Sequence, residues 1–279
     1  MKVLVTGATG FIGNYVIQNL LNRGHQVIAT SVNSQKAKEK HWINSVVYVQ
    51  HDIKTILSEN LYEKFQKPDL LIHLAWGNLI NFKSENHLNI ELPFHILFLN
   101  NLISNGLNDL TCIGTCLEYG LKEGKLSEDM SPEPVISYPK AKNILRLYLQ
   151  ELNSVKNFNF KWMRIFYLYG EGQSSKSILS QLQKSIDNNE EYFNMSKGDQ
   201  TRDYLPVESV SENIVKFALQ NKVQGVVNCS SNQPITIIDL VKNYLDKLGI
   251  KIKLNTGYYP YLDYEPKNFW GSDEKLKLL

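Results

Sequence analysis

Residues 6–13 read "TGATGFIG", and they join the apolar run "KVLVTG" to a helical pattern that stops at Gly24. Gly7 permits a tight turn, Gly10 lets the backbone approach a pyrophosphate, and Gly13 lets the helix pack against the strand. The N-terminus of that helix would offer backbone N–H donors to the phosphates. The spacing G-x-x-G-x-x-G differs from the commoner G-x-G-x-x-G, yet its place between strand and helix predicts a dinucleotide site. The same turn contributes Thr9, Phe11 and Ile12 to this predicted site.

Short apolar runs alternate with helical patterns through the first half of the chain. This alternation predicts an α/β fold with a doubly wound parallel Rossmann sheet, covered by helices on both faces. We expect a Rossmann domain for NAD(P) over residues 1–165 and a smaller C-terminal substrate-binding lobe over residues 166–279, partly interleaved with the sheet. The runs that follow the first strand are 25–30, 46–53, 69–76 and 109–116.

Ligands of such a sheet bind at the carboxyl ends of its strands. Ser31 stands where an acid would grip an adenosine ribose 2′-hydroxyl, and Asn33, Lys36 and Lys38 follow it. Because an uncharged site beside lysines suits a 2′-phosphate, we expect NADP(H) in preference to NAD(H). Asp52 could bond the adenine amino group or simply cap a turn. Ile53, Leu74 and Ala75 complete the expected cofactor contacts.

Composition excludes several other classes of protein. The 279 residues include 30 basic and 28 acidic ones, so the dense basic face of a nucleic-acid binder is not expected. No apolar run approaches the length of a membrane span, and we expect no cleaved targeting segment. Three cysteines suggest reduced thiols and the cytoplasm. Neither these cysteines nor the six histidines, all before residue 96, follow a metal-ligand spacing, so no metal is expected.

Five motifs in order resemble the extended short-chain dehydrogenase/reductases, the NAD-dependent epimerase/dehydratase family of nucleotide-sugar enzymes. The resemblance implies a Rossmann domain, a substrate lobe and a catalytic Thr/Ser-Tyr-Lys set. The tail "GYYPYLDYEPKNFWG" (257–271) is similar to that of small reductases of 4-keto-6-deoxyhexose nucleotides. The motifs are "TGATGFIG", "GTCLEYG" (114–120), "YPKAK" (138–142), "RIFYLYGEGQ" (164–173) and "QTRDYLPVESV" (200–210).

The catalytic set would be Thr115, Tyr138 and Lys142. Tyr138 and Lys142 are four residues apart and share a helix face, with Pro139 tolerated in the first turn. We expect the ammonium to lower the tyrosine pKa from its usual value of about 10. The phenol would then protonate a carbonyl oxygen as hydride reaches the carbon, and Thr115 would bond the same oxygen. Lys142 would also bond the nicotinamide ribose.

Two departures from the family pattern narrow the chemistry. Cys116 and Leu117 replace the Asp and Glu with which dehydratases of this family move protons at neighbouring sugar carbons, so dehydration is disfavoured. Strand alternation would turn Glu118 away from Leu117, and we interpret it as structural. Tyr167 stands where sugar 4-epimerases commonly have Asn, which weakens an epimerase interpretation.

The substrate contacts follow from the same resemblance. Arg202 matches the family's diphosphate-binding arginine, since a guanidinium suits that anion, although pairing with Asp203 or Glu208 is the alternative. Trp76 would wall the sugar pocket near the nicotinamide or pack in the core. The aromatic tail would cap the substrate or pack the second lobe. The remaining expected contacts are Cys116, Tyr167, Lys176 and Asn194.

These observations predict an NADPH-dependent reductase of a nucleotide-linked, dTDP-type 4-keto-6-deoxyhexose. Its product would be a deoxysugar such as dTDP-fucose or dTDP-6-deoxytalose for surface polysaccharide synthesis. The alternative enzyme is an NAD-dependent UDP-hexose 4-epimerase, and the alternative class is a sensor or scaffold that binds NADP without turnover. Surplus apolar residues on the helices 87–104 and 139–152 predict a homodimer through a four-helix interface, unless the small lobe or a loop covers them.

Overall fold

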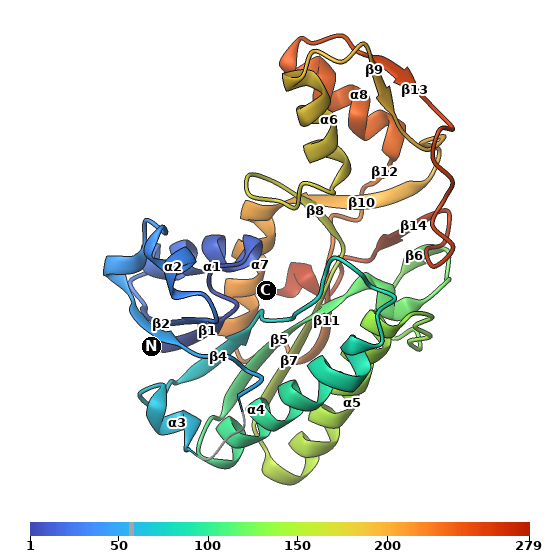
Figure 1. Cartoon of the computed structure of the whole chain (residues 1–279). Helices are drawn as coiled ribbons and strands as arrows, with labels where there is room; N and C mark the ends of the chain where they lie inside the picture. The colour runs from blue at the N-terminus through green and yellow to red at the C-terminus, as the bar shows by residue number, and fades with distance from the viewer. Residues whose placement is uncertain (56–58) are drawn as a thin grey trace.

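The computed structural model describes residues 1–55 and 59–279. Its centre is a sheet of seven parallel strands in the order β11-β7-β5-β4-β1-β2-β3 (Figure 1). This arrangement confirms the predicted doubly wound sheet, with a further strand beyond the six of the usual order. The strands are β1 (Lys2–Thr6), β2 (Gln26–Ser31), β3 (Val47–Gln50), β4 (Leu70–His73), β5 (Asp109–Thr115), β7 (Asn159–Ile165) and β11 (Gly225–Cys229).

Helices cover both faces of this sheet, because its strands are apolar on both sides. Successive residues of β1 show the division: Val3 and Val5 pack with α1 and α7, whereas Leu4 packs with α4 and α5. The covering helices are α1 (Phe11–Asn22) and α7 (Val207–Leu219) on one face, and α3 (Leu61–Lys64), α4 (Leu92–Ser104) and α5 (Ser137–Lys156) on the other; the short helix α2 (Ser34–Lys38) follows β2.

The helix predicted over residues 87–104 begins with a π-helical turn, His87–Glu91, before α4. A π-helical segment widens the turn and often marks a functional region. Here it places two buried polar side chains, His87 and Glu91, beneath the loop that follows β4. The strand predicted over residues 109–116 ends at Thr115, and a 3₁₀ helix, Cys116–Tyr119, follows it.

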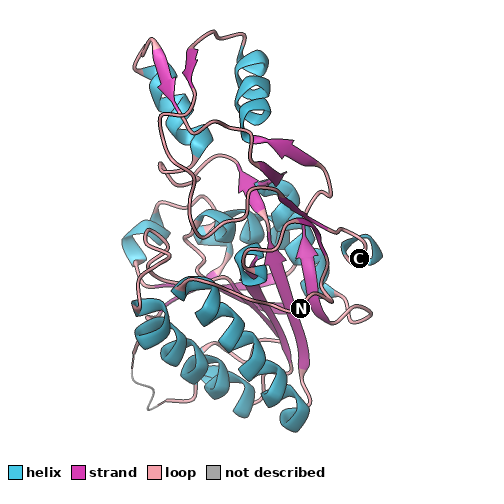
Figure 2. Ribbon diagram, turned by 90° about the vertical axis from the view of Figure 1, so that its right-hand side faces the viewer, coloured by secondary structure: helices cyan, strands magenta, loops and turns pink. Residues whose placement is uncertain are grey.

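The second half of the chain builds a smaller lobe beyond the end of β7, as Figure 2 shows from the side. Leu182, Phe193 and Val241 form part of its own apolar core. The chain does not stay in this lobe, since α7 and β11 return to the main sheet. The boundary expected at residue 165 between the Rossmann domain and the small lobe therefore remains a proposal. The elements are α6 (Ile178–Asp187), α8 (Ile237–Leu248), the pair β9 (Tyr192–Asn194) and β13 (Lys253–Asn255), and the sheet of β8 (Tyr167–Tyr169), β10 (Thr201–Pro206) and β12 (Pro234–Thr236).

The last residues bind back to the Rossmann part of the molecule. Strand β14 (Phe269–Gly271) pairs in parallel with β6 (Gly124–Leu126). This pairing anchors the preceding segment, residues 257–268, beside the small lobe. Across residues 1–55 and 59–279, none of the helices combines the length and apolar character that a membrane crossing needs.

A buried ion pair stabilises the end of β5. The Glu118 carboxylate is fully buried and accepts hydrogen bonds from Arg164 Nε at 2.8 Å and from the backbone N–H of Thr115 at 2.9 Å. The indole N–H of Trp162 donates to the same carboxylate. The structural interpretation of Glu118 is confirmed, but its reason was wrong, because residues 116–119 form a 3₁₀ helix and not a strand.

Removing the cation of this pair should destabilise the fold strongly. We expect Arg164→Met to lower the free energy of unfolding by roughly 3–5 kcal/mol, since it removes the cation that is hydrogen-bonded to the buried Glu118 charge and leaves only Arg146, at 3.9 Å. Urea denaturation measures this loss. Lys67→Met is the matched control: it breaks the exposed Lys67–Glu63 pair and should cost less than about 1 kcal/mol. Equal, small losses in both variants would contradict the role assigned to Arg164.

Candidate active site

The turn after β1 has the shape that a dinucleotide needs. Gly7 has a φ of +66°, and a Cβ there would lie 2.9 Å from the backbone nitrogen of Ala75. A Cβ on Gly13 would overlap the Gly7 carbonyl oxygen. Helix α1 starts after Gly10 with no side-chain cap and no acidic residue in its first turn. Its first N–H groups are therefore open to an anion, so these residues fit a pyrophosphate.

The other predicted cofactor residues follow neighbouring strands at one edge of the sheet. The register pairs Thr6 with Thr30 and with His73, so the ends of β1, β2 and β4 lie level. The structure thus brings the predicted set together along the carboxyl edge. The set is Thr9, Phe11 and Ile12 in the β1 turn, Ser31, Asn33 and Lys36 after β2, Asp52 and Ile53 after β3, and Leu74, Ala75 and Trp76 after β4.

Several of these side chains already have partners within the chain. Ser31 Oγ lies 3.0 Å from the hydroxyl of Tyr48. The Asn33 side chain accepts a hydrogen bond from the backbone N–H of Lys36 and caps α2. The Asp52 carboxylate accepts from the backbone N–H of Lys54 at 2.9 Å, which is the turn cap named as its alternative. A bond from Asp52 to an adenine amino group remains a prediction.

Tyr138 and Lys142 lie together in the first turns of α5. The Tyr138 ring stacks on Phe82 with centroids 4.9 Å apart and meets the edge of Trp76 at 6.2 Å. Lys142 Nζ donates to the carbonyl oxygen of Ile113 at 2.8 Å and lies 4.1 Å from the centre of the Trp76 ring. Trp76 therefore contacts both the tyrosine and the lysine.

Thr115 reaches the same place from β5. Its Oγ accepts a hydrogen bond from the backbone N–H of Leu117 at 3.3 Å, which leaves the hydroxyl proton for another acceptor. Tyr138 packs in one cluster with Cys116 and Leu117, directly after Thr115. All three predicted catalytic residues thus meet where β5 ends and α5 begins.

The expected pKa of Tyr138 is wrong for this structure. Burial raises the pKa of Tyr138 above its usual 10, and the nearby Glu118 and Cys116 raise it further. Lys142 does not offset this effect, because its ammonium is directed at Ile113 and Trp76, and burial lowers the pKa of Lys142 to about 8. Tyr138 therefore holds its proton at neutral pH and can act as an acid.

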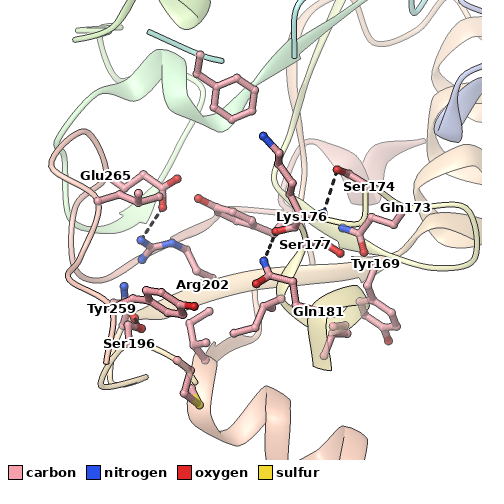
Figure 3. Close-up of a pocket in the computed structure, with 18 of the residues that line it drawn as sticks. Tyr169, Gln173, Ser174, Lys176, Ser177, Gln181, Ser196, Arg202, Tyr259 and Glu265 are labelled. Atoms are coloured by element: carbon pink, nitrogen blue, oxygen red, sulfur yellow. Dashed lines mark hydrogen bonds and ion pairs between the residues drawn. The ribbon is translucent and has the colours of Figure 1, made fainter. Parts of the chain in front are cut away.

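A cleft of about 660 Å³ lies between the small lobe and the loop 79–83 (Figure 3). Four of the predicted substrate contacts line it, whereas Trp76 and Cys116 do not. Phe82 connects the cleft to Tyr138, since it lines the cleft and stacks on the tyrosine ring, and Tyr167 packs against the same apolar cluster as Tyr138. The four residues that line the cleft are Tyr167, Lys176, Asn194 and Arg202.

Arg202 is paired with an acid that the sequence analysis did not consider. Its guanidinium Nη2 lies 2.8 Å from Glu265, a pair drawn in Figure 3, and Nη1 donates to two backbone carbonyls. The alternative partners named for it were wrong, because Asp203 accepts from the backbone N–H groups of Ser231 and Asn232 instead. Contact between Arg202 and a diphosphate remains a prediction, and it requires the guanidinium to share or leave Glu265.

Sequence reasoning missed most of the wall of this cleft. Lys83 Nζ forms an ion pair with Asp263 at 2.7 Å and joins the loop after β4 to the C-terminal segment. Tyr259 and Tyr264 line the cleft, whereas Phe269 packs against Phe166. The aromatic tail therefore lines the cleft at one end and packs beside the Rossmann part at the other, and its role as a cap on the substrate remains a prediction. Its aromatic composition was the one signal that could have located it.

The described residues, 1–55 and 59–279, contain no group of three His, Cys, Asp or Glu side chains arranged to hold a metal ion. The three cysteines are buried and free. Burial raises the pKa of the Cys112 thiol to about 12 and that of the Cys229 thiol likewise, so neither is a thiolate at neutral pH.

Proteins of known sequence and structure are similar to this chain over its full length. It is 29% identical to the dTDP-6-deoxy-L-talose 4-dehydrogenase (NAD(+)) of Aggregatibacter actinomycetemcomitans, across 98% of this chain and 100% of that relative. It is 25% identical to the dTDP-4-dehydro-6-deoxyglucose reductase of Escherichia coli, across 89% of this chain and 82% of the relative.

The fold is that of a solved structure of UDP-glucuronic acid 4-epimerase from Bacillus cereus, in complex with UDP-glucuronic acid and NAD. The TM-score is 0.85 with 23% identity, over 100% of this chain and 92% of that one. The model of the NAD dependent epimerase/dehydratase family matches residues 3–230, which contain all five motifs of the predicted resemblance. The resemblance is thereby confirmed, and the chain belongs to the NAD-dependent epimerase/dehydratase family.

Proposed function

We propose that this protein reduces the C4 keto group of a dTDP-linked 4-keto-6-deoxyhexose with NADPH. The observation that carries the proposal is the arrangement at the end of β5. Thr115, Tyr138 and Lys142 meet there, while the following positions hold Cys116 and a buried Leu117. Such a site can protonate one carbonyl oxygen, but it lacks the acids that dehydration at neighbouring carbons needs. The names of the dTDP-sugar dehydrogenase and reductase relatives support the same substrate class.

In this mechanism a bound dinucleotide supplies hydride to the sugar carbon. Tyr138, which holds its proton at neutral pH, donates that proton to the sugar oxygen. Thr115 donates a second hydrogen bond to the same oxygen as negative charge develops on it. Phe82, which lines the cleft and stacks on Tyr138, and Tyr167, which lines the same cleft, would exclude water from the sugar. The nucleotide would occupy the cleft, where Lys176 and Arg202 would bind its diphosphate.

The alternative remains an NAD-dependent UDP-hexose 4-epimerase. It is favoured by relatives such as a Bacillus subtilis protein named as an uncharacterized UDP-glucose epimerase, which is 24% identical across the whole chain. The two activities differ in stoichiometry. A reductase oxidises one NADPH for each sugar reduced, whereas an epimerase returns the hydride and shows no net change. Following NADPH absorbance with dTDP-4-keto-6-deoxyglucose as substrate separates them, and absence of NADPH loss with any 4-keto sugar nucleotide would reject the reductase.

Replacing the proton donor tests the mechanism itself. We expect Tyr138→Phe to lower kcat by roughly 10²–10⁴-fold, the usual contribution of a general acid, with NADPH affinity unchanged. Tyr148→Phe, on the same helix, is the matched control and should retain wild-type turnover. Full turnover by Tyr138→Phe would show that another group protonates the sugar. It would also favour the alternative class, a sensor or scaffold that binds a dinucleotide and has no need of Tyr138.

The preference for NADPH rests on the end of β2. No acidic residue lies between Ser31 and Lys38, which favours NADPH. One relative is named for NAD(+), so the preference needs a direct test. We expect Ser31→Asp to shift the ratio of kcat/KM for NADPH over NADH by roughly tenfold or more toward NADH, because a carboxylate repels a 2′-phosphate. Ser104→Asp adds the same charge at the far end of α4 and should not change the ratio. A wild-type protein that prefers NADH would contradict the cofactor proposal.

We also propose a homodimer through α4 and α5, which lie side by side (Figure 1). Leu97 is 55% exposed and Leu147 is 51% exposed, and Ile90 and Ile144 extend these two apolar surfaces. The small lobe leaves all four exposed, so the alternative in which it covers them loses support.

Sedimentation at micromolar concentration should show twice the chain mass. Leu147→Glu should yield monomers, because it would bury a charge in an apolar interface. Leu248→Glu on α8 replaces an equally exposed leucine of the small lobe and should leave the dimer intact. A wild-type chain that stays monomeric would reject the interface.

Three buried, reduced cysteines fit the cytoplasm as the compartment of this assembly.

A further inference from the structure

A chain of polar side chains runs through the core beneath the proposed cofactor site. Thr6 Oγ lies 2.9 Å from His73 Nδ1, and His73 Nε2 lies 2.8 Å from His95 Nδ1. His95 Nε2 faces Glu91 Oε2 at 3.7 Å, and Glu91 Oε1 pairs with Lys54 Nζ at 2.5 Å. His73, His95 and Glu91 are buried. This series of polar contacts joins the end of β1 to the segment after β3. It takes no part in the proposed proton or hydride transfer.

The carboxylate at one end decides the direction of these hydrogen bonds. Glu91 carries negative charge and faces His95 Nε2 at 3.7 Å, so we assign the His95 proton to Nε2, which leaves Nδ1 bare toward His73. His73 then donates from Nε2 and accepts at Nδ1 from the Thr6 hydroxyl. That hydroxyl in turn accepts from the backbone N–H of Ala75 at 3.3 Å. Each member has one role, and both imidazoles are neutral.

The electrostatics agree with this assignment. Burial lowers the pKa of His73 well below 6.5 and lowers that of His95 to about 4, in spite of the bond to Glu91. Burial alone would raise the pKa of Glu91, but the bonds from His95 and Lys54 lower it to about 2. The other charged or titratable groups that face the chain are Lys142 and, across Trp76, His87. A proton added to His95 would set two N–H groups against each other.

This series of polar side chains fixes the position of the loop that follows β4. Glu91 Oε2 accepts from the backbone N–H of Gly77 at 3.2 Å, and any Cβ on Gly77 would overlap this carboxylate. The His95 ring stacks beneath Trp76, with centroids 4.4 Å apart and planes 16° apart. Trp76 is the surface on which the Lys142 ammonium rests. His95 and Glu91 therefore determine where residues 75–77 lie relative to the β1 turn and to Lys142.

We propose that His95 and Glu91 are positioning residues for the dinucleotide, an inference that rests on the proposed function. Neither touches the cofactor. They act by holding Ala75 against Gly7 and Trp76 beneath Lys142, so that the loop is already in place when the dinucleotide binds. A buried polar chain is costly unless every member is satisfied, and then it specifies a single arrangement, which an apolar core does less well. Pre-organisation of this kind increases affinity without a new contact.

The test compares two buried histidines. His95→Phe keeps a ring beneath Trp76 but leaves the N–H of His73 without its acceptor and the Glu91 carboxylate without the imidazole that faces it. His51→Phe is the control, because His51 is also buried and stacked on an aromatic ring, Phe98, but lies outside the chain. We expect the dissociation constant for NADPH, measured by fluorescence titration, to rise about tenfold in His95→Phe, as for a lost buried hydrogen bond. It should stay near the wild-type value in His51→Phe.

A second variant and a spectroscopic measurement keep the inference testable if His95→Phe fails to fold. Glu91→Gln keeps the size of the side chain and removes the charge that orders the chain, and it should also weaken NADPH binding. In the wild type, imidazole ¹⁵N shifts should show His73 and His95 neutral at pH 7, both protonated on Nε2. A proton on Nδ1 of either ring would overturn the inference. So would wild-type affinity in both folded variants, with the proposed function intact. A wild-type protein that binds neither NADPH nor NADH would reject the proposed function itself.

Discussion

The close approach of Gly7 to Ala75 is the constraint on which the rest of the site depends. A left-handed residue with no side chain lets β1 turn at once into α1, and the backbone of the β4 loop fills the space where a Cβ would stand. Two neighbouring strand ends are thereby brought into contact. Helix α1 begins uncapped over the same edge. The cofactor edge is therefore a packed backbone surface before any ligand arrives.

Two buried ion pairs stabilise the sheet beneath this edge. Glu118 is bound by Arg164 at the end of β5, and Lys161 pairs with Asp109 at the beginning of that strand at 2.9 Å. Charges of this kind are tolerated in a core only when they are paired and hydrogen-bonded. Both pairs join β5 to β7 or to its flanks. They hold β5, whose last residue is Thr115, so the position of the predicted catalytic residues depends on polar contacts as well as on apolar packing.

The proposed substrate cleft follows a different rule, because it forms between segments far apart in the chain. The loop after β4 supplies Phe82 and Lys83, and the C-terminal segment supplies Asp263 and Glu265. The Lys83–Asp263 ion pair joins these two segments. The Arg202–Glu265 ion pair occupies the arginine of the cleft. Glu265 is the counter-ion that holds the Arg202 guanidinium in place in this structure. In the function proposed here, a diphosphate would replace that carboxylate as the anion at Arg202.

The sequence by itself determined the doubly wound parallel sheet, the glycine turn and the placement of Tyr138 and Lys142 on one helix face, because each depends on local periodicity or on spacing of a few residues. Only the tertiary structure decided that the Lys142 ammonium lies on Trp76, that Arg202 binds Glu265, and that His73, His95 and Glu91 form one chain. These contacts join residues that no local pattern relates. Their geometry follows from how β4, α4 and the C-terminal segment pack, and burial then sets the pKa of each group in a direction that spacing alone cannot reveal.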